Sequence, residues 1–128
     1  MNFTWKYVKP LKNQNSIENF EAKYGVKFPE DLKEIFKQHN GGRPSAKYFD
    51  TASGKEQEFK SLLSFNADDV ESIFDYVFPD NKDVIPFATD PAGNLFCFYR
   101  NAIYYWQHET NRMEYLTNTF SEFLGKLY

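Results

Sequence analysis

Three side chains carry the chemistry that most often serves catalysis or metal binding: Cys97, His39 and His108. A thiolate beside an imidazole base can act as a nucleophile. Cys97, however, lies in the aromatic run Leu95–Tyr99, where an unactivated cysteine is usually a small structural residue. Neither histidine has a second ligand at helical or zinc-ribbon spacing, and Cys97 has no cysteine partner. We therefore predict neither a metal site nor a catalytic thiol.

Neighbouring carboxylates offer a second route to catalysis, through general acid–base chemistry. The pairs are Asp68 with Asp69 and Glu56 with Glu58. Adjacent acids at the start of a helix are better explained by the helix dipole. The Gly41-Gly42 pair lacks the pattern of a phosphate-binding loop, and it follows a predicted helix rather than preceding one. The sequence therefore predicts no enzyme and no cofactor.

Negative charge is concentrated between residues 64 and 83. Six carboxylates stand there against Lys82 alone, which gives a local net charge of −5: Asp68, Asp69, Glu71, Asp75, Asp80 and Asp83. One interpretation is the solvated face of a helix. The other is an acidic surface for a basic partner, because such a field accelerates encounter more than it adds affinity. Both interpretations stay open.

Length and composition limit the class of protein. A chain of 128 residues favours one domain, residues 1–128, with a core rich in its 14 Phe and 9 Tyr. A net charge of −3 lacks the basic excess of a nucleic-acid-binding protein. The single cysteine fits a reducing compartment, and the sequence shows neither a signal peptide nor a membrane-spanning run of about 20 apolar residues. We expect a cytoplasmic protein that binds neither membranes nor nucleic acid directly.

Caps and apolar periodicity predict four helices, over about residues 15–25, 29–40, 66–79 and 119–127. Gly25 and the Gly41-Gly42 pair end the first two, because glycine readily takes the left-handed conformation. The third has acids in its first turn and an apolar stripe at i, i+3, i+4 and i+7 spacing: Val70, Ile73, Phe74 and Val77. The fourth begins with the capping box Thr119–Glu122.

Strand patterns occupy about residues 48–50, 58–63, 84–88, 95–99, 103–107 and 113–116. Pro86 indicates an edge strand or a bulge. A tight turn is predicted from Asp90 to Asn94, since Asp accepts bonds from nearby backbone N–H groups. The order lacks regular βαβ alternation, so we predict an α+β fold with a central, mostly antiparallel sheet flanked by about four helices.

Two blocks of residues, taken in order, resemble the SUKH superfamily. The first joins the two N-terminal helices and is marked by Gly25, Pro29, Asn40, Gly41 and Gly42. The second is the Pro-Phe-Ala strand with its turn, followed by an aromatic strand, and is marked by Pro86, Asp90, Gly93 and Trp106. The resemblance covers about residues 15–127. Phe28 stands before the proline where usual members have an aliphatic residue, which preserves the apolar role.

This superfamily includes yeast cell-wall assembly regulators and many bacterial immunity proteins. The resemblance implies a fold without a catalytic site. It also implies an immunity protein that binds the C-terminal domain of a cognate secreted toxin, often a nuclease, and occludes its active site. The alternative is a regulatory or scaffold module that binds proteins, as in the cell-wall assembly regulators.

The shared motif residues resemble fold determinants, so they do not identify a binding site. We expect partner contacts at acidic and aromatic side chains instead: Glu56, Glu58, Asp68, Asp69, Glu71, Asp75, Tyr104 and Trp106. For Trp106 we expect a place in the core or a partly buried one first, and a place at the interface second.

Overall fold

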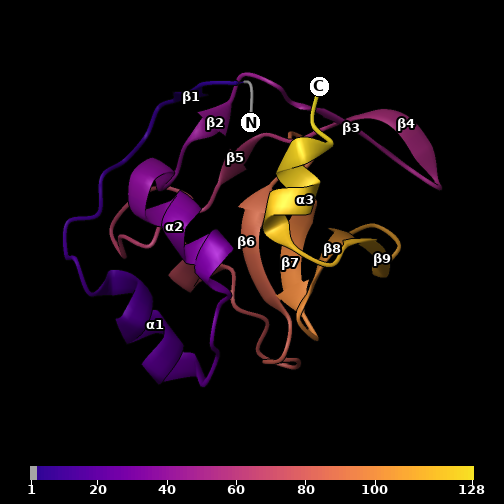
Figure 1. Cartoon of the computed structure of the whole chain (residues 1–128). Helices are drawn as coiled ribbons and strands as arrows, with labels where there is room; N and C mark the ends of the chain where they lie inside the picture. The colour runs from indigo at the N-terminus through magenta and orange to yellow at the C-terminus, as the bar shows by residue number, and fades with distance from the viewer. Residues whose placement is uncertain (1–2) are drawn as a thin grey trace.

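The structure is a computed structural model that describes residues 3–128, so Met1 and Asn2 of the predicted domain lie outside the described residues. Its helices are, in chain order, α1 (Ser16–Tyr24), α2 (Glu30–His39), the short 3-10 helix η1 (Ile73–Asp75) and α3 (Phe120–Gly125) (Figure 1).

All the strands pair antiparallel. The largest sheet has five strands in the order β5 (Ser61–Leu62), β6 (Ile85–Thr89), β7 (Leu95–Tyr99), β8 (Ala102–Gln107) and β9 (Arg112–Thr117). Two smaller sheets pair β1 (Trp5–Lys6) with β2 (Arg43–Pro44) and β3 (Tyr48–Thr51) with β4 (Gly54–Glu58). The predicted α+β class and antiparallel pairing are confirmed, whereas the predicted single sheet is divided into three.

The first two helices end where the sequence predicts. Gly25 lies in the left-handed region at φ 65°, and its N–H donates to the carbonyl of Glu21. Pro29 precedes α2 in extended conformation, one residue outside the helix it was predicted to begin. Gly41 follows α2 at φ 71°, a conformation that favours glycine.

Helices α1, α2 and α3 lie on the same side of the five-stranded sheet (Figure 1). Aromatic contacts join α2 and α3 to its inner face. The ring of Phe36 lies 6.4 Å from Phe87, and Phe120 lies 5.1 Å from Phe87, in both cases edge to face. Phe123 of α3 packs against Phe96 at 5.4 Å. Such pairs add to the free energy of simple burial, so this face forms the main core.

Pro86 lies in β6, which is between β5 and β7 in the sheet order. It pairs with Cys97 of β7, whereas the two-residue β5 pairs only with Ala88 and Thr89, so no β5 residue lies opposite Pro86. The register between β6 and β7 shifts between Pro86 and Ala88, which is the bulge that the proline indicated as an alternative.

The predicted third helix over residues 66–79 is wrong. Only the three residues of η1 are helical there, so the described chain has three α-helices rather than about four. Val70, expected on the buried stripe, is 78% exposed, and Glu71 has a positive φ of 59°. The backbone instead turns back on itself, since the N–H of Ser64 donates to Glu71 and that of Ile73 donates to Ser64.

Side chains in this loop compete with the helix for hydrogen bonds. The carboxylate of Asp69 accepts from the Ser64 hydroxyl at 2.7 Å and from the Asn66 amide at 2.9 Å. The Asn66 amide also donates to the carbonyl of Pro10 and accepts from the N–H of Lys12. These bonds tie the loop to the segment before α1, and they explain why propensity and periodicity do not produce a helix.

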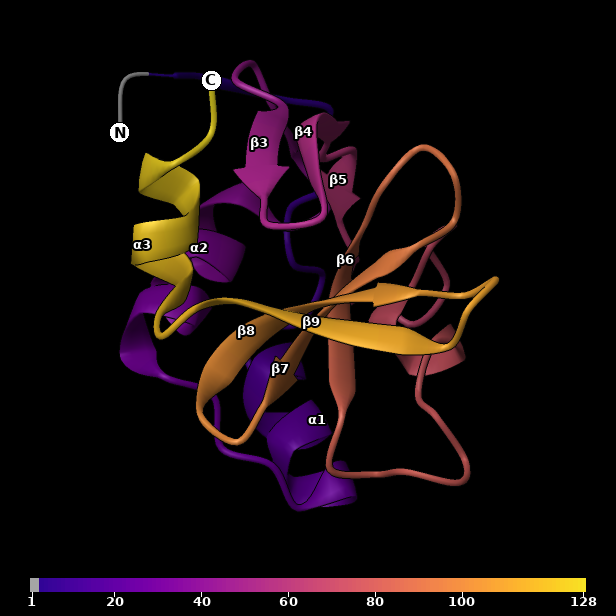
Figure 2. The same ribbon diagram turned by 90° about the vertical axis from the view of Figure 1, so that its right-hand side faces the viewer.

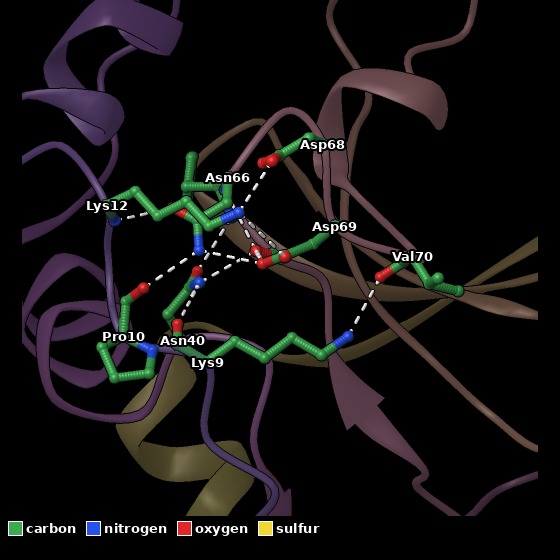
Figure 3. A network of polar contacts seen from close by, with 10 residues as sticks. Lys9, Pro10, Lys12, Asn40, Asn66, Asp68, Asp69 and Val70 are labelled. Carbon is green, nitrogen blue, oxygen red and sulfur yellow. Dashed lines mark hydrogen bonds and ion pairs between the residues drawn. The ribbon is translucent and has the colours of Figure 1, made fainter.

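Asn40 lies beneath this loop and is 1% exposed (Figure 3). Its amide nitrogen donates to the Lys9 carbonyl at 2.8 Å and to the Ser64 hydroxyl at 3.0 Å. Its amide oxygen accepts from the N–H of Phe65 at 2.9 Å. The carbonyl of Asn40 accepts a fourth bond, from the N–H of Lys9, at 2.7 Å. One buried residue therefore holds the N-terminal segment and the 64–72 loop against the end of α2.

Replacing Asn40 by alanine leaves the Lys9 carbonyl and the Phe65 N–H without these partners in a buried place. We expect Asn40→Ala to lower the free energy of unfolding by about 2–4 kcal/mol. Urea unfolding followed by circular dichroism measures this loss. The control is Asn19→Ala, since Asn19 is exposed on α1 and its side chain has no hydrogen bond among the described residues. Equal stability of the two variants would contradict the role of Asn40.

Candidate partner-binding face

No helix lies over the outer face of strands β7, β8 and β9 (Figure 2). Alternation and register bring five large residues together on it: Tyr99, Tyr104, Trp106, Met113 and Tyr115. We call this set the aromatic face. Tyr104 pairs directly with Tyr115, and their ring centroids lie 5.8 Å apart. Tyr99 lies 5.5 Å from Tyr104. A continuous row of rings therefore crosses three strands.

The aromatic face is open to solvent in part. Tyr115 is 51% exposed, and the other four residues are half-buried. Exposed apolar residues are common singly, but a contiguous patch usually marks a contact surface. Tyrosine and tryptophan are also the residues that most often anchor protein interfaces. The outer face of the sheet is therefore a candidate surface for binding a partner.

The segment from residue 76 to residue 84 covers one end of this face. Tyr76, Phe78 and Val84 pack there over Leu95 and Cys97 of β7. The ring of Phe78 meets Trp106 edge to face, with centroids 5.0 Å apart and an interplanar angle of 63°. The Trp106 indole N–H donates to Asn111 at 2.8 Å, which fixes the ring. Trp106 is thus shared between a small second core and the open surface.

A pocket of about 300 Å³ opens beside Trp106. Its walls come from the 78–84 segment and from strands β8 and β9 with the turn between them: Phe78, Pro79, Asp80, Asn81, Val84, Trp106, Asn111 and Met113. Aromatic and aliphatic groups form most of the lining, and a carboxylate and two amides supply polar atoms. Such a lining suits the side chain of a partner.

Cys97 has no access to a substrate. It is 0% exposed beneath the 76–84 segment, and burial raises the pKa of its thiol well above the usual range. His108, the conceivable base, contacts the carbonyl of Ala92 through Nε2 at 3.0 Å. The thiol therefore stays protonated and serves as a small packing residue.

The rate at which Cys97 reacts with a thiol reagent shows whether the 76–84 segment stays packed over it. We expect the native protein to react with a thiol reagent such as Ellman's reagent at least about a hundredfold more slowly than the unfolded chain, because reaction needs both access and a thiolate. An Ala52→Cys variant is the control, since Ala52 is exposed in the β3–β4 turn and should label at once. Rapid labelling of Cys97 would show that the 76–84 segment does not stay packed.

The turn after β6 is organised around the buried carboxylate of Asp90. One oxygen accepts from the N–H groups of Ala92 at 2.9 Å and Asn94 at 2.8 Å. The other accepts from the Asn94 amide at 2.9 Å and from the Tyr105 hydroxyl at 2.5 Å. Gly93 takes φ 87°, which other residues resist. Four donors occupy the carboxylate, so Asp90 builds the turn and has no need of a ligand.

Burial and the bond to Asp90 raise the pKa of the Tyr105 hydroxyl far above its usual value. The unfolded chain releases this proton near pH 10, whereas the folded protein keeps it. Folding is therefore stabilised below pH 10, and the stabilisation is lost as the pH rises further, by up to about 1.4 kcal/mol per pH unit for this one proton.

We expect unfolding titrations between pH 8 and pH 11 to show a smaller alkaline loss of stability for Tyr105→Phe than for the native protein. Burial also raises the pKa of Tyr76, and the bond to Asp50 raises that of Tyr128. These tyrosines add to the alkaline loss of stability in both proteins, so the quantity to compare is the difference in that loss between Tyr105→Phe and the native protein. Tyr104→Phe is the control, since its hydroxyl has no hydrogen bond in residues 3–128. Parallel pH curves for Tyr105→Phe and the native protein would contradict the assignment.

The acidic residues expected at the interface do not form one patch. Asp68 and Asp69 face Lys12, whose Nζ lies 2.7 Å and 3.8 Å from them (Figure 3). The bond from Lys12 lowers the pKa of Asp68, and bonds from Asn66 and Ser64 lower that of Asp69. These two carboxylates are therefore engaged within the chain.

The other four acids do not contact Lys12. Glu71 forms an ion pair with Lys60 at 3.1 Å and accepts from the Thr89 hydroxyl at 3.3 Å. Glu56 and Glu58 are exposed on β4, and Asp75 is exposed in η1. Of the eight expected contact residues, the structure brings only Tyr104 and Trp106 onto one face.

Sequence reasoning missed the partners of those two residues, namely Tyr99, Met113, Tyr115, Phe78 and Asp80. The signal was present in part, because the pairing of the predicted strands places Tyr115 opposite Tyr104. The strands β7 and β8 are apolar at almost every position, however, so alternation alone does not say which face is covered.

The described residues thus define a class of protein: an α+β fold with an uncovered aromatic sheet face and no assembled group of reactive side chains. Residues 13–126 match the family described as the SMI1 / KNR4 family (SUKH-1). This match spans most of the chain, so the protein belongs to that family, and the resemblance to the SUKH superfamily is confirmed. The superfamily includes toxin immunity proteins. A comparison with curated proteins found no match.

The helices of residues 3–128 are too short and too polar for any of them to cross a membrane.

Proposed function

We propose that this protein is an immunity protein, which binds a cognate protein toxin in the cytoplasm and neutralises it by covering its active site. The observation that supports this proposal is the aromatic face. It presents Tyr104, Tyr115 and Trp106 from rigid, paired strands, so binding costs little conformational entropy. Membership of a family that includes toxin immunity proteins supports the same proposal.

Neutralisation by occlusion needs only a surface, and the side chains of this protein suit that role. The Cys97 thiol is buried and protonated, and the Asp90 carboxylate is occupied by four donors. Neither group is free to act on a substrate. We therefore propose a non-enzymatic protein that acts through its affinity for the partner.

Charge would direct the encounter. Asp68, Asp69 and Glu71 are paired within the chain, so we assign them a smaller share of the contacts than the sequence indicated. Asp75 is exposed and forms no ion pair among the described residues, and it lies just before the segment that borders the aromatic face. A basic toxin such as a nuclease would be attracted to this negative field, while the aromatic side chains would supply most of the affinity.

A regulatory or scaffold protein would use the same face for a different partner. The gene next to the one that encodes this protein distinguishes the two functions. An immunity protein is encoded next to a large secreted protein with a toxic C-terminal domain.

We expect coexpression with that toxin domain to restore growth, and Tyr104→Ala or Trp106→Ala to weaken binding by about tenfold to a hundredfold. Isothermal titration calorimetry with an inactivated toxin measures the affinity. Tyr7→Ala is the matched control, because Tyr7 is 71% exposed and lies outside the aromatic face.

A charge-reversed variant at Asp68, Asp69, Glu71 and Asp75 tests the acidic residues separately. Full protection by Tyr104→Ala and Trp106→Ala, together with loss of protection by a charge-reversed variant that keeps the circular dichroism spectrum of the native protein, would place the interface on the acidic residues instead. Absence of rescue by the native protein would refute the immunity function.

A further inference from the structure

The pocket beside Trp106 combines an aromatic wall with an uncompensated carboxylate. Phe78 and Trp106 form the wall, with ring centroids 5.0 Å apart. Asp80 lies on the lining, is exposed, and forms neither an ion pair nor a side-chain hydrogen bond within residues 3–128. A cation placed here would have two aromatic rings and a carboxylate as neighbours.

The polar atoms of the lining also favour a donor group. Asn81 and Asn111 lie on the same lining as Asp80. The amide oxygen of Asn111 already accepts from the Trp106 indole N–H, which holds the ring in place. A planar guanidinium presents five N–H donors, stacks on aromatic rings and is weakly hydrated, so it suits such a pocket better than an ammonium group does. The volume of about 300 Å³ leaves room for one long side chain.

Acidic residues outnumber basic ones in the segment that forms one wall of the pocket. Segment 75–83 carries three exposed carboxylates, those of Asp75, Asp80 and Asp83, against Lys82 alone. None of these three carboxylates forms an ion pair in the part of the chain that the structure describes. This contrasts with Asp68, Asp69 and Glu71, which lysines of the chain neutralise.

We propose that this pocket receives an arginine side chain of the partner protein, with Trp106 and Phe78 contacting the guanidinium and Asp80 pairing with its charge. The inference rests on the proposed function, because it assumes a protein partner that docks on the aromatic face. It adds a specific requirement, namely that the partner presents an arginine at the edge of its contact surface.

The experiment is a titration of the ¹⁵N-labelled protein with N-acetyl-L-argininamide, followed by NMR. The reporter is the indole N–H resonance of Trp106, which is assigned by its disappearance in Trp106→Phe and is thereby separated from that of Trp5. We expect a saturable shift of this resonance in the millimolar range. N-acetyl-L-citrullinamide, which has nearly the same shape without the charge, should bind at least about threefold more weakly.

Variants separate the pocket from the general field of the segment. We expect Asp80→Asn to weaken argininamide binding by about threefold to tenfold, since it removes the charge and keeps the shape. Asp83→Asn is the matched control, because Asp83 belongs to the same segment but does not line the pocket, and it should change the affinity by less than about twofold. Both substitutions are on exposed residues, so the fold should be unaffected.

Three results would overturn the inference: no shift of the Trp106 resonance, an equal affinity for citrullinamide, or an equal effect of Asp80→Asn and Asp83→Asn. The titration contains no toxin, so its outcome does not depend on growth rescue. If argininamide binds and rescue fails, the pocket assignment holds and the immunity function fails. If rescue succeeds and argininamide does not bind, the immunity function holds and the pocket assignment fails.

Discussion

The fold depends on the buried amide of Asn40. The oxygen and the nitrogen of a buried amide both need hydrogen-bond partners, because a buried polar atom without one has lost its bonds to water and destabilises the fold. Asn40 satisfies both by bonding to Lys9, Ser64 and Phe65, which come from two segments distant in sequence. This fixes the 64–72 loop at the end of α2 and makes the chain turn back at Ser64 (Figure 3). The segment that follows the loop then reaches the opposite side of the sheet, where Tyr76 and Phe78 pack over Cys97.

The two faces of the five-stranded sheet are consequently covered in different ways. The three α-helices lie on the side of the inner face, on which Phe96 and Phe98 are buried, whereas a single irregular segment reaches the outer face (Figures 1 and 2). Strands that are apolar on both sides normally require cover on both sides. The segment meets this requirement at Leu95 and Cys97 but leaves Tyr104 and Tyr115 partly open. The aromatic face is therefore a partly exposed apolar surface of the kind that often serves as an interface.

The predictability of each element follows from the range of the interactions that form it. Local signals placed α1, α2 and α3 correctly, because Gly25 ends one helix and the Thr119 hydroxyl caps another within a few residues. The helix predicted over 66–79 fails because Asn66 and Asp69 bond to groups as distant as Pro10, which no local pattern reveals. The site was predictable only for Tyr104 and Trp106. Their common face depends on strand register, and Asp80 joins them only through the packing of Phe78 against Trp106.

The same long-range contacts change the meaning of the acidic run in the sequence. Three of its six carboxylates are neutralised by Lys12 and Lys60, so they stabilise the loop and are poorly placed to attract a partner. Of the three that are left, all exposed, Asp80 lines the pocket beside Trp106, so a free carboxylate and an apolar anchor occupy one region of the surface. A partner that covers Tyr104 and Tyr115 would also exclude water from the rim near Asp80, and a charge pair there would strengthen as the local dielectric falls. The aromatic contact and the charge contact would thus reinforce each other, which neither the acidic run nor the aromatic strands indicate when considered alone.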